Sequence, residues 1–360
     1  MKKTTSPVDR FKAFSREYIP LIDSSMRDFF QTKMKSAEHP VISEMYGLLE
    51  EFCVREGKRI RPLVLLISCF GYGGGRKHRE AILIASVLEI FHSFLLVQDD
   101  IIDRAELRRG GKALHLICGD RYGSRSHNRH IGSDIALILG DVLFADALEI
   151  VCESGMAPRL KEKVMKILAG TLEVTAWGQI LDILHSNSKK IESPRETAVW
   201  IAMMKTAHYT VYYPLLMGYL LAGKNSEREM NAIREFSLPL GLAFQIRDDL
   251  LGVFGIEDDT GKSSDSDILE GKVTILVDAT IEKLERRDRE RFMALFTRRK
   301  KNARDVRRIR MMMAASGSRE AAVERHGELI ERSREMLAGL VMADRYRKVL
   351  GGLVELIEKI

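Results

Sequence analysis

The sequence predicts an all-α fold, and three observations support this prediction. Apolar residues recur at helical spacing along nearly the whole chain. Residues that favour helices are abundant, and the 360 residues include only 8 prolines. Strand signals are scarce, because no Asn-Gly or Asp-Gly turn joins two alternating segments. Since 45% of the residues are apolar, the chain is able to bury a substantial core.

Short polar or glycine-containing segments divide the helical pattern into separate helices. Helices are expected at residues 8–36, 40–55, 59–71, 77–103, 132–154, 159–186, 194–222, 226–254, 271–284, 287–298, 301–315, 318–336 and 340–358. Breaks are expected at the glycine turn 71–77 and at the polar loops 118–134, 186–194 and 255–272. Pro194 is expected in the first turn of the helix that follows it. No repeat or change of composition marks a linker, so residues 1–360 are expected to form one domain.

Charge and cysteine content narrow the class of protein. A net charge of +6 fits either an ordinary basic surface or an affinity for anionic ligands. Charges alternate in sign beyond about residue 281, as on a solvated helix face, so no nucleic-acid partner is expected. The four cysteines lack metal-ligand spacing and are expected to be free thiols. Neither a signal peptide nor a membrane-spanning segment is expected, which predicts a cytoplasmic protein.

The segment "FLLVQDDIIDRAELRRGG", residues 94–111, places three carboxylates at the end of an apolar helix. Asp99 and Asp103 lie about one turn apart on the same face, where like charges destabilise a helix by about 0.2–0.5 kcal/mol. Bound Mg²⁺ would reverse that effect, and Mg²⁺ prefers one or two carboxylates together with waters and substrate phosphates. The motif, which also contains Asp100, therefore indicates a Mg²⁺–diphosphate site. A surface acidic patch is the alternative.

A second segment, "FQIRDDLLGVFG" at residues 244–255, repeats the pattern. Here an apolar helix ends at Asp248 and Asp249. If the two helices face one another, their carboxylates frame the mouth of a cavity. Two such motifs in one chain favour a shared metal site over a surface patch.

Basic residues accompany both acidic motifs. The candidate clamps for diphosphate oxygens are Lys58, Arg59, Arg61, Arg108, Arg109, Lys205, Lys262 and Lys272. Arginine fits a phosphate by bidentate hydrogen bonding, whereas lysine acts as a point charge. His92 lies two turns before Asp99 on the same face. Each of these residues taken alone is equally typical of a solvated or partly buried side chain.

Together these segments resemble the trans-isoprenyl diphosphate synthases. The resemblance is carried, in the family's order, by "GKRIRP", "FHSFLLVQDDIIDRAELRRGG", "GQILDI", "KTAHYT" and "GLAFQIRDDLLGVFGIEDDTGKSSDSDILEGKVTIL", which span residues 57–277. It implies a single-domain isoprenoid synthase helical bundle around a deep central cavity. It also implies an enzyme that condenses isopentenyl diphosphate head to tail with an allylic diphosphate and releases pyrophosphate.

The resemblance also assigns roles to the candidate residues. Three Mg²⁺ ions are implied, and the metal ligands would be Asp99, Asp103 and Asp248. Asp100 and Asp249 would support them. The allylic diphosphate would be held by Arg108, Lys205, Lys262 and Lys272. Isopentenyl diphosphate would be held by Lys58, Arg61, His92 and Arg109. Thr206 and Gln245 would face the carbocation with their oxygen dipoles.

Two positions depart from the commonest pattern of the family. Gln98 stands where a histidine often precedes the first acidic pair, and Gly252 occupies the third acidic position of the second motif. A direct third ligand is therefore impossible at residue 252.

Product length is expected to depend on bulky residues before the first motif. Phe94, five residues before Asp99, with non-aromatic Leu95 after it, resembles the geranylgeranyl diphosphate synthases, and Phe91 lies one turn earlier. On an ideal helical wheel only Leu95 faces the Asp99 side. Ordinary core packing of both phenylalanines is therefore the alternative.

Other functional assignments remain as alternatives. A farnesyl diphosphate or longer-chain synthase would share every motif above. A terpene cyclase would not need the second diphosphate site that "GKRIRP" and "RRGG" provide, and a non-catalytic subunit would be expected to lose acidic or basic motifs. The resemblance further implies a homodimer.

Overall fold

The computed structural model describes residues 6–125, 128–186, 197–255 and 265–359. It confirms the all-α fold class. The chain divides into two compact units, which are described separately. Unit 1 comprises Met1–Phe11, Ile167–Leu216 and Asn225–Ile360, and unit 2 comprises Lys12–Lys166 and Met217–Lys224. The single domain expected from the sequence stays a prediction.

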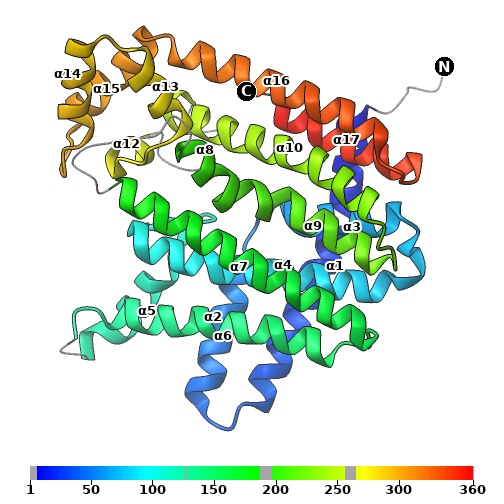
Figure 1. Cartoon of the computed structure of the whole chain (residues 1–360). Coiled ribbons are helices and arrows are strands. Elements are labelled where there is room, and N and C mark those ends of the chain that lie inside the picture. The colour runs from blue at the N-terminus through cyan, green and yellow to red at the C-terminus, as the bar shows by residue number, and fades with distance from the viewer. Residues whose placement is uncertain (1–5, 126–127, 187–196, 256–264, 360) are drawn as a thin grey trace. The chain divides into compact units, whose positions relative to one another are not determined.

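Unit 2 is built around one long buried helix. Its helices are α1 (Pro7–Ser36, whose first turn belongs to unit 1), α2 (Pro40–Cys53), α3 (Ile60–Gly71), α4 (His78–Asp103), α5 (Leu114–Tyr122) and α6 (Ile131–Glu153). Helix α4 packs against α3 and α6, and α5 packs against α6 (Figure 1). Because α4 is apolar on nearly every side, its middle forms the core, while its polar C-terminal end emerges from it.

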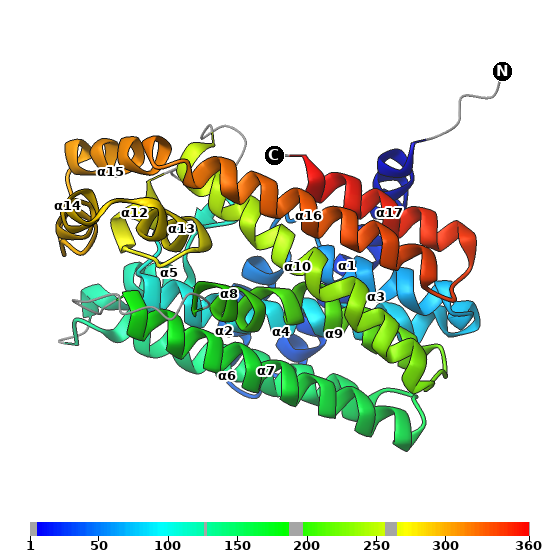
Figure 2. The ribbon, with the colours of Figure 1, turned by 45° about the horizontal axis from the view of Figure 1, so that its top comes forward.

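Unit 1 contains the second long central helix, α10 (Glu227–Phe254). The other elements are most of α7 (Pro158–Ser186), α8 (Thr197–Ala202), the π-helix η3 (Met203–Tyr212), the start of α9 (Tyr213–Leu221), α12 (Ser266–Glu270), α13 (Ile275–Lys283), α14 (Arg286–Phe296), α15 (Ala303–Ala315), α16 (Ser318–Gly339) and α17 (Asp344–Glu358). Helix α10 packs along α16 and η3, and α17 lies beside α16 (Figure 2).

Four local features differ from the prediction. Helix α12 lies within the expected polar loop 255–272, and α13 begins at Ile275, later than the expected start at 271. Helix α5 occupies part of the expected loop 118–134, because its small apolar face packs closely on α6: a Cβ at Gly132 would lie 2.3 Å from the carbonyl oxygen of His115. The expected regular helix at 194–222 contains the π-helix η3. A two-stranded hairpin, β1 (Leu107–Arg108) and β2 (Gly111–Lys112), was also not expected.

The residues of the hairpin turn explain why the hairpin was not predicted from the sequence. Its two loop residues, Arg109 (φ 52°) and Gly110 (φ 74°), both have positive φ, as in the two-residue turns that fit the strand twist. Asn or Asp is the usual first residue of such a turn, whereas this chain has an arginine. Among the described residues, the only non-glycine positions with positive φ are Arg59, Arg104 and Arg109.

Two described helices, α4 and α7, have the length and composition of membrane spans. The apolar window of α4 is 67% buried, as expected for a core helix. The window of α7 is only 22% buried. Exposed apolar side chains on α7 include Trp177, Ile180 and Leu184, which are three and four residues apart and therefore share one face.

Candidate functional site

The first acidic motif lies at the C-terminal end of α4. The side chain of Asp99 is 25% exposed, whereas that of Asp100 is 1% exposed. Asp103 is the last residue of the helix, and no basic residue lies in its last turn. A helix C-terminus carries partial negative charge, so three carboxylates there require compensating cations.

Arg108 supplies one of these cations from strand β1. Its Nε donates to Asp100 Oδ1 at 2.8 Å, its Nη2 donates to the same oxygen, and Nη2 also lies 3.4 Å from Asp99 Oδ2. Burial raises the pKa of Asp100, although the hydrogen bonds from Arg108 oppose the shift. Asp100 Oδ2 is buried and has no hydrogen-bond partner within the described residues. The hairpin therefore holds one carboxylate oxygen of Asp100 and leaves the other without a hydrogen bond from any residue that the structure describes.

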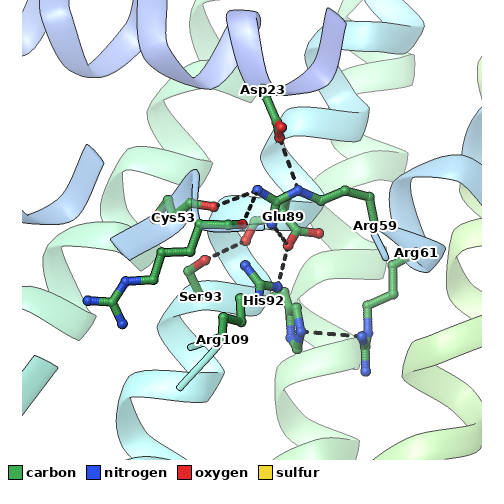
Figure 3. Close-up of polar contacts among 9 residues, drawn as sticks. Asp23, Cys53, Arg59, Arg61, Glu89, His92, Ser93 and Arg109 are labelled. Atoms are coloured by element: carbon green, nitrogen blue, oxygen red, sulfur yellow. Dashed lines mark hydrogen bonds and ion pairs between the residues drawn. The ribbon is translucent and has the colours of Figure 1, made fainter. Parts of the chain in front are cut away.

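The segment "GKRIRP" precedes and begins α3 in the same unit. Lys58 is exposed, and Arg61 Nη1 lies 3.3 Å from His92 Nε2 (Figure 3). Since a guanidinium only donates, His92 Nε2 accepts this bond. Loss of solvation, together with nearby arginines such as Arg61, holds the pKa of His92 well below its ordinary value. His92 is therefore neutral at physiological pH.

Two arginines of this group share a buried carboxylate that sequence reasoning did not single out. Glu89 Oε1 accepts from Arg59 Nη1 at 2.6 Å and from Arg109 Nη2 at 2.5 Å. Arg59 is fully enclosed, so it is an internal anchor and not a diphosphate ligand. The signal for Glu89 was weak, because the residue is one acid within the apolar segment "ASVLEIF".

The second acidic motif lies near the end of α10 in unit 1. The side chain of Asp248 is 47% exposed, whereas Asp249 is 4% exposed. Thr206 Oγ1 donates to Gln245 Oε1 at 2.6 Å, and Gln245 Nε2 donates to Asp249 Oδ1 at 2.7 Å. Burial raises the pKa of Asp249 well above its usual value, although the bond from Gln245 opposes the shift. This chain of bonds joins three predicted residues.

Lys205 and Thr206 are presented by the π-helix η3. Lys205 Nζ donates to Asp182 Oδ2 at 2.9 Å, and Asp182 belongs to the segment "GQILDI" of α7. Glycines allow close packing on both sides of η3. A Cβ at Gly178 would lie 2.8 Å from Lys205 N, and one at Gly241 would lie 2.6 Å from the Cα of Ala207. Wide helical turns of this kind are frequent at functional sites.

A carboxylate occupies the space beside Gly252, but it comes from another element. A Cβ at Gly252 would lie 2.6 Å from Oδ2 of Asp267 on α12. Lys272, just beyond α12, pairs with Glu270 at 2.8 Å. Lys262 lies outside the described residues. The sequence did not single out Asp267, because it follows a polar loop and is not part of an acidic motif at the end of an apolar helix.

The predicted chain-length residues pack between α4 and α6 in unit 2. The ring of Phe94 lies 5.8 Å from that of Phe91 and 5.3 Å from that of Phe144, measured between centroids. Phe94 Cδ2 would also lie 3.7 Å from a Cβ at Gly140. Phe91 and Phe94 are buried, and Leu95 is half-buried. Phe144 was not predicted, because nothing in the sequence connects it to α4.

The predicted residues thus form two groups, one in each unit. The unit 2 group contains Lys58, Arg61, His92, Asp99, Asp100, Asp103, Arg108 and Arg109. The unit 1 group contains Lys205, Thr206, Gln245, Asp248, Asp249 and Lys272. That the two groups face one another stays a prediction. A cavity of about 760 Å³ within unit 1, whose walls include Trp200, Leu238 and Leu329, is lined by none of the predicted residues.

The carboxylates fit magnesium better than a metal held by protein alone. Within the described residues, no three His, Cys, Asp or Glu side chains converge on one potential metal position. Asp99 and Asp103 are one turn apart on α4, and Asp248 is half-exposed on α10. Mg²⁺ usually takes one or two carboxylates and completes its octahedron with waters and phosphates. The donor set is therefore suited to Mg²⁺ that arrives with a diphosphate.

Comparison with known proteins places the chain in a family. The family model described as polyprenyl synthetase matches residues 42–313. A geranylfarnesyl diphosphate synthase of Aeropyrum pernix is 30% identical over 302 residues, which cover 83% of this chain and 88% of that protein. A geranylgeranyl diphosphate synthase of Saccharolobus solfataricus is 30% identical over 275 residues, or 76% of this chain and 75% of the relative.

Solved structures support the same family. Geranylgeranyl pyrophosphate synthase of Corynebacterium glutamicum, complexed with isoprenyl diphosphate and magnesium, has a TM-score of 0.88 and 25% identity, covering 95% of this chain and 98% of that one. Polyprenyl synthase of Caulobacter crescentus, complexed with calcium and isoprenyl diphosphate, has a TM-score of 0.81 and 26% identity over 99% of both chains. The chain therefore belongs to the polyprenyl synthetase family, the magnesium-dependent trans-isoprenyl diphosphate synthases, and is a prenyltransferase that uses isoprenyl diphosphate substrates.

Proposed function

We propose that this prenyltransferase condenses isopentenyl diphosphate with allylic diphosphates up to geranylgeranyl diphosphate. The observation that carries the proposal is the same arrangement at the end of two apolar helices. Near its C-terminal end, each helix carries a partly exposed aspartate followed by a buried one that is hydrogen-bonded to a neighbouring side chain. Asp99 and Asp248 thus have partly solvent-exposed carboxylates, while Asp100 and Asp249 are held in place by hydrogen bonds.

Two observations support geranylgeranyl diphosphate as the product. Several relatives are named geranylgeranyl diphosphate synthases. Phe94 is a single aromatic residue five positions before Asp99, and its ring is fixed between α4 and α6. The Aeropyrum relative, named a geranylfarnesyl synthase, makes a longer product the second candidate. A farnesyl product is the third.

The charged residues act on the leaving diphosphate. Ionisation of the allylic C–O bond builds negative charge on the departing group, and fixed cations that face this charge lower the barrier. The proposed cations are Arg108, Lys205, Lys262 and Lys272. Three Mg²⁺ ions, held by Asp99, Asp103 and Asp248, would supply further Lewis-acid stabilisation of that charge.

The remaining residues hold the second substrate and protect the intermediate. Lys58, Arg61, His92 and Arg109 are proposed to bind the diphosphate of isopentenyl diphosphate. Neutral His92 is suited to this task as a hydrogen-bonding group and not as a charge. The oxygen atoms of Thr206 and Gln245 would face the carbocation, which their dipoles stabilise.

A homodimer and a cytoplasmic location complete the proposal. The exposed face of α7 formed by Trp177, Ile180 and Leu184 is apolar, although the helix belongs to a charged protein. A contiguous exposed apolar surface is typical of a protein interface. A second copy of the chain is the proposed partner of this face.

The deciding experiment measures condensation directly. Purified protein is incubated with radiolabelled isopentenyl diphosphate and dimethylallyl, geranyl or farnesyl diphosphate, and the dephosphorylated alcohols are sized by chromatography. We expect a C20 alcohol whose formation stops when divalent ions are chelated and resumes with added Mg²⁺. Pyrophosphate release without isopentenyl diphosphate would indicate a cyclase. Equal activity after complete removal of divalent ions would contradict the proposal.

A further inference from the structure

A buried carboxylate on α4 joins the two arginine-bearing segments of unit 2. Glu89, whose side chain is 2% exposed, receives Arg59 from the segment before α3 and Arg109 from the hairpin turn (Figure 3). These arginines are 50 positions apart in the chain, and both bonds end on the same oxygen, Oε1. The bonds fix the separation of the two segments.

Arg59 is held at every nitrogen of its guanidinium group. Nε donates to Asp23 Oδ1 at 3.0 Å, Nη1 donates to Glu89, and Nη2 donates to the carbonyl oxygens of Cys53 and Arg55. Its backbone is left-handed, with φ 47° and ψ 37°, a conformation that is strained for a residue with a side chain. Such strain persists only when surrounding contacts over-determine it. The anchored residue thus sets the direction in which Lys58 and Arg61, on either side of it, leave the backbone.

Among the described residues, Arg109 has a hydrogen-bond partner at one nitrogen of its guanidinium group. Its Nη2 donates to Glu89, while its Nη1 is buried and lacks a hydrogen-bond partner anywhere in the described part of the chain. A buried donor without a hydrogen-bond partner destabilises the fold, and more strongly when the group is charged. An anionic oxygen would remove that cost. Arg109 is therefore oriented by Glu89 and still able to donate to a diphosphate.

Glu89 is charged despite its burial. Burial alone would raise its pKa, but the charges of Arg109 and Arg59 outweigh burial and lower it. The carboxylate keeps two guanidinium groups close together that would otherwise repel one another.

We propose that Glu89 is a positioning residue for the binding of isopentenyl diphosphate: by holding Arg59 and Arg109 together, it assembles Lys58, Arg61 and Arg109 into one diphosphate clamp. The inference rests on the proposed function. Glu89 itself does not touch substrate, since its carboxylate would repel a diphosphate and is enclosed by arginines. Substitution of Glu89 therefore weakens binding of isopentenyl diphosphate by displacing the cations that Glu89 holds.

The test compares three variants with the wild-type full-length enzyme. Glu89→Gln keeps the shape of the side chain but removes its charge, and Glu89→Asp keeps the charge on a shorter stem. Asp146→Asn is the matched control, because Asp146 is also a carboxylate of unit 2 with 2% exposure and a cationic neighbour, Lys33. For each protein, KM is measured separately for isopentenyl and allylic diphosphate. The dissociation constant of isopentenyl diphosphate is measured by titration calorimetry, and folding by thermal melting.

The proposal predicts a selective defect. In Glu89→Gln the KM and dissociation constant for isopentenyl diphosphate rise about tenfold or more, as expected for one lost charged hydrogen bond. The KM for the allylic substrate changes less than about twofold, which corresponds to under about 0.5 kcal/mol. Glu89→Asp shows an intermediate defect and decides the matter if Glu89→Gln does not fold. Asp146→Asn alters melting temperature without a selective change in KM.

The outcomes separate this inference from the proposed function. If wild-type protein condenses no substrates, the proposed function fails. If the wild type is active but folded Glu89 variants behave like Asp146→Asn, with equal changes for both substrates or none, only the positioning role is overturned.

Discussion

Each acidic pair of the site places a partly exposed aspartate directly before a buried one. Spacing alone identified Asp99, Asp100, Asp248 and Asp249 as candidates. The structure adds that in each pair the second carboxylate is buried and held, by Arg108 in one case and by Gln245 in the other. Burial depends on side chains distant in sequence, so no local pattern reveals it.

Gly252 offers a test at the residue scale. From the sequence alone, Gly252→Asp would complete the second acidic motif. We expect instead a loss of stability of about 1–3 kcal/mol and weaker Mg²⁺ activation, because the new side chain would crowd and repel Asp267. Thermal melting and Mg²⁺ titration of the initial rate measure both effects.

Two further variants serve as controls for Gly252→Asp. Gly252→Ala adds the Cβ without charge and separates crowding from repulsion. Gly252→Asp combined with Asp267→Ala should recover stability, because the carboxylate gained at residue 252 replaces the one removed at residue 267. Tighter Mg²⁺ activation in Gly252→Asp alone would show that Asp267 does not fill the missing position.

Asp146 predicts a pH dependence of stability. Burial raises its pKa from 3.8 to about 6, although Lys33 opposes the shift. In this window the folded state binds more protons than the unfolded state, so this carboxyl lowers stability as pH rises from about 4 to about 6. The cost above pH 6 is about 3 kcal/mol. Relative to wild type, Asp146→Asn should therefore gain unfolding free energy between pH 4 and pH 7.5, as measured by urea denaturation. Parallel pH profiles would contradict this account.

At the scale of elements, long periodic helices were predictable and irregular ones were not. The start and end of α10 were expected within one residue, since its apolar pattern is continuous over 28 residues. The π-helix η3 was hidden because its sequence has ordinary helical periodicity. Its geometry depends on close packing at Gly178 and Gly241, which only the folded chain brings together.

The contact between α4 and α6 allows a test of product length. Phe94→Ala opens space between these helices, and we expect the largest product to lengthen by at least one isoprene unit, as sized by chromatography of the alcohols. Phe30→Ala, which removes another fully buried ring of unit 2, is the control and should leave the products unchanged. Each loss of a ring should destabilise the fold by about 3–5 kcal/mol. An unchanged product spectrum in folded Phe94→Ala would assign its ring to core packing alone.

At the scale of the whole molecule, fold class and family followed from the sequence because they depend on periodicity and on motifs spread over residues 57–277. Helix α5 did not, because its nine residues bury only a small face. The division into two units was also not foreseen. No linker marks it, and α1, α7 and α9 each have residues in both units.

The exposed face of α7 predicts an effect on assembly. Trp177→Glu with Ile180→Glu should convert the proposed dimer to a monomer, because two charges would have to be buried in an apolar contact. Light scattering coupled to size-exclusion chromatography measures the mass. Trp200→Glu, which alters an equally exposed tryptophan on α8, is the control and should leave the mass unchanged. A wild-type monomer, or a dimer that survives the double substitution, would refute this interface.

The three left-handed arginines have a consequence for attempts to make this enzyme heat-resistant. Relieving positive φ at non-glycine residues is an ordinary route to higher thermostability, and Arg59, Arg104 and Arg109 are where such a design would begin. Two of them, Arg59 and Arg109, are also the residues held by Glu89. Glycine at Arg59 or Arg109 would relieve the strained backbone, but it would also remove a cation that pairs with the buried carboxylate of Glu89. We therefore expect such a design to lower both heat resistance and the capture of substrate, so the strained backbone has to be kept in any hardened version of this chain.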